Sequence, residues 1–276
     1  MIRRYLPWLL LGALVLAQVC YPLTGGATRA RLTVATVLLG YLLSVGHALL
    51  TRGPRTAAAL VAVATGGGFA IEALGVATGF PFGTYDYSGQ LGPKLAGVPL
   101  IIPLAWTWMA WPAWLAAVRL TGGVAPDGAD RLRRIALATV GLAAWDLFLD
   151  PQMVAEGYWR WPDPDPALPG LPGIPVSNYL GWLLFAVLMM TALRPLAGPA
   201  VDRTGPADAP MHALYLWTYA SSVLAHAVFL ALPASALWGA AGMAVTAVPL
   251  AVALGRRRHD RRRHPDRPRD PVDAAA

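Results

Sequence analysis

The chain has 276 residues, of which 56% are hydrophobic and 13% are charged. Soluble domains carry about 25% charged residues, so this composition excludes an ordinary soluble domain. The net charge of +7 comes mainly from arginines after residue 255. A short basic tail beside apolar segments is typical of contact with anionic lipid, and we expect no nucleic-acid partner.

Apolar runs of about 20 residues recur along the chain, and each is long enough to cross a hydrocarbon core about 30 Å thick. Because backbone hydrogen bonds must be satisfied inside lipid, the sequence predicts an all-α, polytopic transmembrane helical bundle. Residues 1–255 are expected to form a single transmembrane domain, and residues 256–276 a disordered basic cytoplasmic tail. About eight spans are predicted, near residues 5–23, 32–50, 56–78, 98–118, 134–150, 176–193, 211–231 and 233–254.

The distribution of Lys and Arg predicts the orientation. With eight spans and a cytoplasmic N-terminus, eighteen of the 22 basic residues lie on the cytoplasmic side, and only Arg29, Arg31, Lys94 and Arg160 lie outside. Such a bias in short loops determines orientation. We therefore expect a multi-pass protein of the cell membrane with both termini in the cytoplasm.

One stretch of the sequence occurs twice. Residues 93–100 (PKLAGVPL) recur 76 positions later as residues 169–176 (PGLPGIPV), and the same offset relates Trp106 to Trp182. Each copy follows a loop rich in aromatic and acidic residues and lies between two apolar spans. The sequence therefore predicts a duplicated helix–loop–helix unit, residues 56–118 and 134–193, with its chemistry near the loops.

Polar residues are expected to converge at the outer ends of these spans. Glu72 and Asp146 lie within spans and Asp150 at a span boundary, where ionisable groups are costly and indicate function. Asp86 lies in the outer loop that follows Glu72, and Asn178 opens the sixth span from the same side. We predict that these five candidate catalytic residues meet in one pocket under the outer leaflet.

Asp146 and Asp150 are four residues apart, so both point from one face of a helix. Two like charges in a low dielectric cannot both ionise at low cost, and one carboxyl should hold a proton near neutral pH. Such an acid suits a reaction that begins with protonation. A purely structural role, in pairing with arginines or in ending the helix at Asp150-Pro151, stays open.

Aromatic residues are dense around the acids. They form either an interfacial belt or a slot whose rings stabilise a developing cation. No metal site is predicted, and the single cysteine, Cys20, excludes a cysteine-based zinc site. The candidate substrate-binding residues are Tyr85, Tyr87, Trp106, Trp145, Trp159 and Trp182.

Five motifs carry a resemblance to a known family: residues 72–75 (EALG), 79–87 (GFPFGTYDY), 97–103 (GVPLIIP, with Trp106), 145–151 (WDLFLDP) and 173–179 (GIPVSNY). Together they resemble the CruF-type carotenoid hydratase family, integral membrane proteins of carotenoid biosynthesis. The likeness is close over roughly residues 60–190. It implies addition of water to the terminal double bond of an acyclic (ψ) carotenoid end, giving a tertiary alcohol without a redox cofactor. It also implies a lipophilic carotenoid substrate, surrounding membrane lipid, and other carotenoid biosynthesis enzymes as partners.

The roles of the residues are inferred from the chemistry of hydration, which needs one acid and one base. Asp146 or Asp150 is the expected acid, and Glu72 or Asp86 the expected base that orients water, with Asn178 as a hydrogen-bond partner. Three other functions stay open. A carotenoid cyclase shares the protonation step, a membrane prenyltransferase or carotenoid elongase would use the two aspartates for Mg²⁺-diphosphate, and a transporter would explain the repeats and buried acids.

Overall fold

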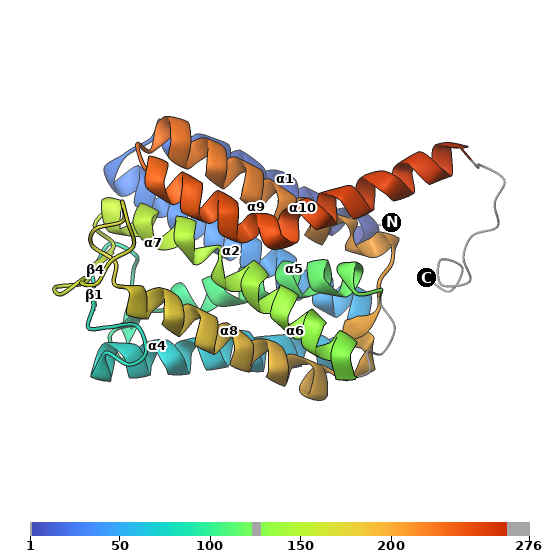
Figure 1. Ribbon diagram of the computed structural model, residues 1–276, viewed down its shortest axis with the longest axis horizontal. Coiled ribbons are helices and arrows are strands. Elements are labelled where there is room, and N and C mark those ends of the chain that lie inside the picture. The colour runs from blue at the N-terminus through green and yellow to red at the C-terminus, as the bar shows by residue number, and fades with distance from the viewer. Residues whose placement is uncertain (1, 123–127, 264–276) are drawn as a thin grey trace.

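The computed structural model describes residues 2–122 and 128–263, and their fold is the predicted all-α bundle (Figure 1). The first half contains α1 (Ile2–Cys20), η1 (Tyr21–Leu23), α2 (Gly26–Arg52), α3 (Pro54–Leu60), η2 (Val61–Gly66), α4 (Gly67–Thr78), β1 (Asp86–Tyr87), β2 (Lys94–Leu95), β3 (Val98–Pro99) and α5 (Ile102–Leu120). The second half contains α6 (Gly128–Ala143), α7 (Asp146–Ala155), β4 (Trp159–Arg160), α8 (Val176–Ala197), η3 (Pro199–Asp202), η4 (Pro206–Asp208), α9 (Ala209–Leu224), η5 (Ala225–Phe229) and α10 (Pro233–Arg263).

Glycine and proline set the ends of these helices. Gly53 ends α2 with a positive φ of 89°, and Pro54 begins α3 at once. Glycine adopts positive φ freely, and proline fits the first turn of a helix, where its missing N–H has no intrahelical partner. Gly79 ends α4 in the same way, with its N–H donating to the Gly75 carbonyl oxygen at 2.7 Å. The chain therefore turns into the first aromatic loop directly after the helix that carries Glu72.

The multi-pass architecture is confirmed, but the count of eight spans is not. Within the described residues, five helical segments are long and apolar enough to cross a membrane: Arg4–Leu23, Gly26–Arg52, Pro54–Thr78, Val176–Ala197 and Pro233–Arg256. The fifth predicted span is two helices, because the chain turns at residues 144–145 between α6 and α7. α9 passes into a π-helical turn, η5. α5 is not among these segments, and it carries four tryptophans and two prolines.

The position of α5 explains its composition. It lies inside the bundle, packed against α2, α6 and α9, and nearly all its side chains are buried (Figure 1). Its indole N–H groups therefore need partners within the protein. Trp111 donates to His47 Nδ1 at 3.0 Å, and Trp114 donates to the Val201 carbonyl oxygen at 3.1 Å. A helix that faces protein rather than lipid does not need a high hydropathy.

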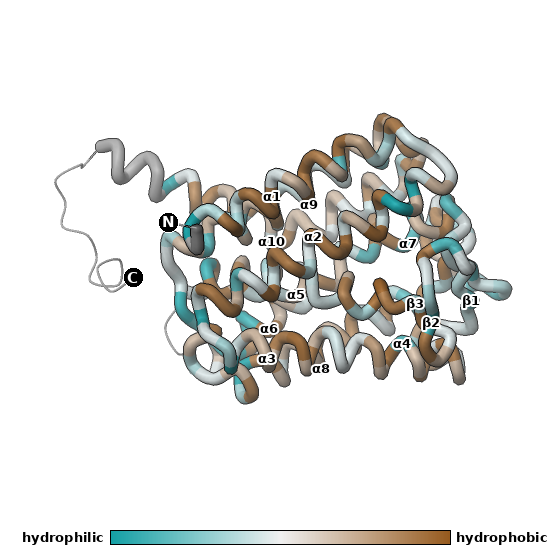
Figure 2. The backbone as a smooth tube through the Cα atoms, turned by 180° about the vertical axis from the view of Figure 1, so that it is seen from behind, coloured by the Kyte–Doolittle hydropathy of each residue, from teal (hydrophilic) through white to brown (hydrophobic). Residues whose placement is uncertain are grey.

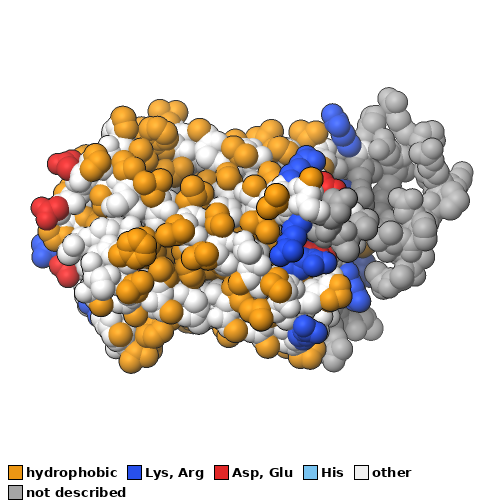
Figure 3. Space-filling view, turned by 60° about the horizontal axis from the view of Figure 1, so that its bottom comes forward, with side chains coloured by type: hydrophobic (Ala, Val, Ile, Leu, Met, Phe, Trp, Pro, Cys, Tyr) orange, Lys and Arg blue, Asp and Glu red, His pale blue; other side chains and the backbone are white. Residues whose placement is uncertain are grey.

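The surface is divided into an apolar middle and two polar ends. Figure 2 shows hydrophobic residues along the length of the helices. The space-filling view in Figure 3 shows a broad apolar band between the two polar ends of the molecule. In Figure 3 most of the Lys and Arg side chains on this face lie at one end, with a few acidic ones among them, and acidic side chains are prominent at the other end. The start of α1 and the end of α10 both lie at the basic end (Figure 1). α10 continues to Arg263, into the segment predicted as a tail, of which residues 264–276 lie outside the described part.

A π-helical turn and a glycine bring α4 close to α5. The turn η2 interrupts the predicted third span before α4 begins. A Cβ atom on Gly68 would lie 3.1 Å from the Trp106 ring, so glycine permits this approach of the two helices. The contact places the next turn of α4, with Glu72, against the same tryptophan.

A buried ion-pair cluster stabilises the basic end. Asp202 accepts from Arg134 Nη1 at 2.7 Å and from Arg194 Nε at 2.5 Å, and the Arg134 side chain is 1% exposed. Because removal of one partner leaves a buried charge poorly compensated, we expect Asp202→Asn to lower the free energy of unfolding by roughly 3 kcal/mol. Thermal unfolding in detergent, with exposed Asp163→Asn as the control, measures this change. Equal unfolding temperatures for the two variants would contradict a stabilising role for the cluster.

Candidate active site

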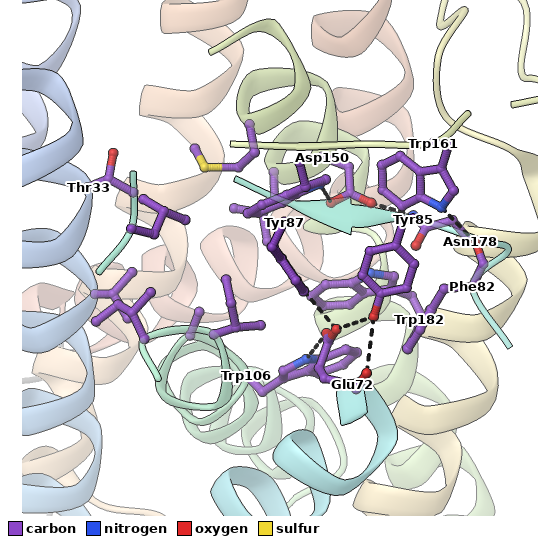
Figure 4. Close-up of a pocket in the computed structure, with 18 residues that line it drawn as sticks. Thr33, Glu72, Phe82, Tyr85, Tyr87, Trp106, Asp150, Trp161, Asn178 and Trp182 are labelled. Carbon is purple, nitrogen blue, oxygen red and sulfur yellow. Dashed lines mark hydrogen bonds between the residues drawn. The ribbon is translucent and has the colours of Figure 1, made fainter. Parts of the chain in front are cut away.

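A cavity lies beneath the two aromatic loops, at the acidic end of the bundle. Its walls come from α2, α4, α5, α7, α8 and the loops (Figure 4). The lining is mostly apolar and aromatic, and its ionisable side chains are two carboxyl groups, Glu72 and Asp150, and two phenols, Tyr85 and Tyr87. Small-molecule sites have this character, with an apolar wall and a few convergent polar groups.

The cavity lies between the two copies of the duplicated unit. β1 from the first loop pairs antiparallel with β4 from the second. The rings of Trp106 and Trp182, which occupy the same position in the two copies, stack with centroids 3.7 Å apart. Tyr85 and Trp161 are also 76 positions apart, and their centroids are 5.6 Å apart. A residue touches its own equivalent only near the axis that relates the copies, so a local two-fold axis passes through this site.

The first copy supplies Glu72, which is 4% exposed. Its Oε2 accepts from the Tyr85 hydroxyl at 2.6 Å and the Tyr87 hydroxyl at 2.8 Å. Its Oε1 accepts from Trp106 Nε1 at 2.9 Å. An indole N–H can only donate, so this carboxyl is held by neutral donors from α5 and the first loop (Figure 4).

Tyr85 and Tyr87 remain hydrogen-bond donors to Glu72. Burial, with the nearby Glu72 carboxyl group as the next cause, raises the pKa of both hydroxyls far above the ordinary range. Both residues lie in the loop, one on each side of Asp86. The loop therefore orients the Glu72 carboxyl group with two phenols that keep their protons at neutral pH.

The second copy supplies Asp146, Asp150 and Asn178, each at most 3% exposed. The Asn178 amide nitrogen donates to Asp146 Oδ2 at 2.9 Å and, in a short contact, to Asp150 Oδ2. Both carboxyl groups therefore meet at one amide nitrogen. Asp150 Oδ1 accepts from Trp159 Nε1 at 3.1 Å. Two like charges this close in a buried site cannot both ionise at low cost.

Asp150 faces the cavity and Asp146 lies behind it. Asp150 and Asn178 line the cavity, whereas Asp146 does not and is fully buried. One Asp146 oxygen, Oδ1, has no hydrogen-bond partner among the described residues. The second copy therefore presents one carboxyl group to the cavity with a second in contact behind it.

Most of the predicted site residues meet here, but Asp86 and Trp145, like Asp146, do not line the cavity. Asp86 is exposed on β1. Successive side chains of a strand point to opposite faces, so Asp86 points outward where Tyr87 points inward. Trp145 packs behind Trp182, which lines the cavity, and the centroids of the two rings are 6.2 Å apart. The cavity residues among the predicted set are Glu72, Tyr85, Tyr87, Trp106, Asp150, Trp159, Asn178 and Trp182.

Several wall residues were not predicted. Trp161 lines the cavity and donates to the Phe82 carbonyl oxygen at 2.9 Å. The 76-residue offset from Tyr85 was a signal that would have found it. Thr33 and Val37 reach the cavity from α2, which lies outside the duplicated unit, and no sequence pattern indicates them.

Comparison with known proteins fixes the family. Residues 32–252 match the family described as carotenoid biosynthesis protein. The chain belongs to the carotenoid biosynthesis protein family. The assignment confirms the family expected from the motifs, and the matched region contains every residue of the cavity wall.

One curated relative of this carotenoid biosynthesis protein is bisanhydrobacterioruberin hydratase of Haloarcula japonica. The two sequences are 40% identical over 117 residues. The aligned part covers 42% of this chain and 37% of the relative. The comparison with solved structures finds no similar one.

Proposed function

We propose that this protein is a carotenoid hydratase, which adds water to the terminal double bond of an acyclic carotenoid end and forms a tertiary alcohol. The observation that carries the proposal is one aromatic cavity with Asp150 on one side and Glu72 on another. The hydratase relative supports the same reaction class. Hydration as written here needs one acid, one base and water, and no redox cofactor.

Asp150 is the proposed acid. Asp150 transfers its proton to the CH carbon of the terminal double bond, and the π electrons form the new C–H bond. A tertiary cation remains on the neighbouring carbon. Asp146 acts as a positioning residue, since it contacts Asp150 from behind, and Asn178 holds both carboxyl groups in place. A carboxylic acid that stays protonated in an apolar site is suited to this step.

Glu72 is the proposed base. Its carboxylate accepts a proton from a water molecule as the water oxygen bonds to the tertiary carbon. The hydrogen bonds from Tyr85, Tyr87 and Trp106 stabilise the ionised form and fix its direction. The proton gained by Glu72 equals the proton lost by Asp150, so each turnover adds one water molecule in total. Proton transfer back to the aspartate pair restores the site.

The aromatic wall stabilises the cation between the two steps. The rings of Trp106, Trp182, Trp159 and the loop tyrosines line the cavity. A cation within about 6 Å of an aromatic ring is attracted to its π-face, and the attraction is stronger in a desolvated site. The stacked Trp106–Trp182 pair lies at the local two-fold axis, where both copies contribute to the wall.

The polar groups favour water over an internal alkene as the group that captures the cation. A cyclase has no use for a group that orients water, whereas here a second carboxyl group with three donors faces the same cavity. The two aspartates both accept from Asn178, an arrangement that does not favour the diphosphate site of a prenyltransferase. Neither the family nor the relative supports a transporter.

We also propose the orientation in the cell membrane. The basic end, with the start of α1 and the end of α10, faces the cytoplasm by the positive-inside rule, and the cavity lies under the outer leaflet. A carotenoid in the lipid would reach the site with one end. Membrane lipid and the enzymes that supply or consume the carotenoid are the proposed partners.

Expression in a bacterial host that accumulates lycopene tests the proposal. We expect a more polar pigment, heavier by one water molecule, with an unchanged polyene absorption spectrum. Chromatography with mass spectrometry measures it, and a parallel incubation with bisanhydrobacterioruberin covers a second acyclic substrate. A product of unchanged mass that absorbs at shorter wavelength would show cyclisation, and no product from either substrate would contradict the proposal.

Trp106→Phe tests the hydrogen bond to Glu72. The variant keeps an aromatic ring but removes the donor that Glu72 Oε1 has among the described residues, so we expect the initial rate of hydration to fall roughly tenfold. The matched control is Trp114→Phe on the same helix, whose N–H donates to a backbone carbonyl away from the cavity. Equal rates for the two variants would exclude a role for the indole N–H.

A further inference from the structure

A second cavity adjoins the active site and has no role in the steps above. It lies between α1, α2, α5, α7 and α9, at the same end of the bundle, and has about 110 Å³ of space for water-sized molecules. It carries more polar side chains than the first cavity. These are Gln18, Tyr21, Thr33, Thr36, Gln152, Thr218, Ser221 and Ser222.

Four buried polar atoms in this wall have no hydrogen-bond partner among the described residues. They are Tyr21 Oη on η1, Thr36 Oγ1 on α2, Trp108 Nε1 on α5 and Thr218 Oγ1 on α9. The large majority of buried polar side-chain atoms in folded proteins are satisfied, by protein or by ordered water. A cavity that is polar and wide enough holds such water. Four segments of the chain therefore present unsatisfied groups to one space that water fits.

The two cavities share part of their walls. Thr33, Val37, Leu149 and Met153 line both. Thr33 is the polar member of this shared wall, and Figure 4 shows it at the edge of the active-site cavity, across from Glu72 and Asp150. The two cavities therefore adjoin at this wall, on the side of the first cavity that faces α2.

We propose that the second cavity is a water chamber that supplies the nucleophile for hydration. The inference rests on the proposed function and adds the source of the water. Ordered water is held by Thr36, Trp108 and Thr218 and passes Thr33 to reach the cation. Its oxygen bonds to the tertiary carbon, and its proton goes to Glu72. The chamber lets an apolar site receive water from one side while the carotenoid end occupies the other.

The fate of the cation gives a direct test. A cation that meets no water loses a proton back to the aspartate pair and returns to the alkene. In D₂O the recovered carotenoid then carries deuterium at the terminal CH carbon. The ratio of deuterium exchange to hydrated product therefore measures how well water is delivered, independently of how much active enzyme is present.

We compare the double variant Thr36→Val/Thr218→Val with the wild-type protein. Valine keeps the shape of threonine and removes the hydroxyl group, so we expect the ratio of exchange to hydration to rise roughly tenfold, as expected for the loss of one or two water-mediated hydrogen bonds. The Thr36→Ser/Thr218→Ser variant keeps the hydroxyl groups and should retain the wild-type ratio. Thr139→Val is the matched control, because Thr139 Oγ1 is equally buried and without a partner among the described residues but lines neither cavity.

The possible outcomes distinguish a failure of the water-chamber proposal from a failure of the proposed hydratase function. An unchanged ratio in the double valine variant would overturn the chamber, and so would an equal rise in Thr139→Val. A higher KM with an unchanged ratio would also overturn it and would assign the space to the polyene chain. Absence of both exchange and hydration in the wild-type protein would instead overturn the proposed function.

Discussion

Asp150→Asn is expected to lower the rate of hydration roughly 10³-fold, because general acid catalysis typically contributes about 10²- to 10⁴-fold. Asparagine keeps the size of the side chain and can still accept from Trp159, but it cannot protonate an alkene. The fold should persist, since Asn178 and Trp159 hold the position. Initial rates of hydrated pigment formation in membranes with equal amounts of protein measure the effect.

Asp86→Asn is the matched control for Asp150→Asn. It makes the same chemical change at an exposed carboxylate of the adjoining loop, and we expect wild-type rates. Deuterium exchange should also disappear in Asp150→Asn, because no cation forms. An Asp150→Asn protein that hydrates at the rate of Asp86→Asn would exclude Asp150 as the acid.

Glu72→Gln is expected to lower the hydration rate about 10²- to 10³-fold, because the attacking water loses the base that removes its proton. The acid on the other side of the cavity is unchanged. The cation therefore still forms and returns to the alkene, so deuterium exchange should continue. Parallel measurement of exchange and hydration in D₂O distinguishes this variant from Asp150→Asn, which should lose both.

Tyr87→Phe is the matched control for Glu72→Gln. It removes one of the three donors to the Glu72 carboxyl group and leaves that group in place. We therefore expect a much smaller loss of hydration rate than in Glu72→Gln. Loss of exchange as well as hydration in Glu72→Gln would assign protonation, rather than water activation, to this side chain.

The repeat in the sequence predicted most of the site. Residues at equal positions in two copies tend to meet near the axis that relates them, and the Trp106–Trp182 stack occurs at such a contact. Because the predicted spans contain few charged residues, Glu72, Asp146 and Asp150 could be identified as candidates from the sequence. Their convergence was predicted from the topology, which put all three near the outer face of the membrane.

Other features depend on local geometry that composition does not encode. Asp86 and Tyr87 are neighbours in sequence, and only the pairing of β1 with β4 decides which of them points inward. The division of the fifth predicted span into α6 and α7 depends on a turn at residues 144–145 with no glycine or proline to mark it. Thr33 and Val37 come from a helix outside the repeat, so their place in the wall required the packed bundle.

Incubation of the purified protein with an acyclic carotenoid in water labelled with oxygen-18 tests the central claim most directly. We expect a product with one added water molecule per modified end, with the label in the new hydroxyl group, as mass spectrometry of the product and its dehydration fragment would show. A product without the label, or one with the mass of the substrate, would contradict hydration by this protein.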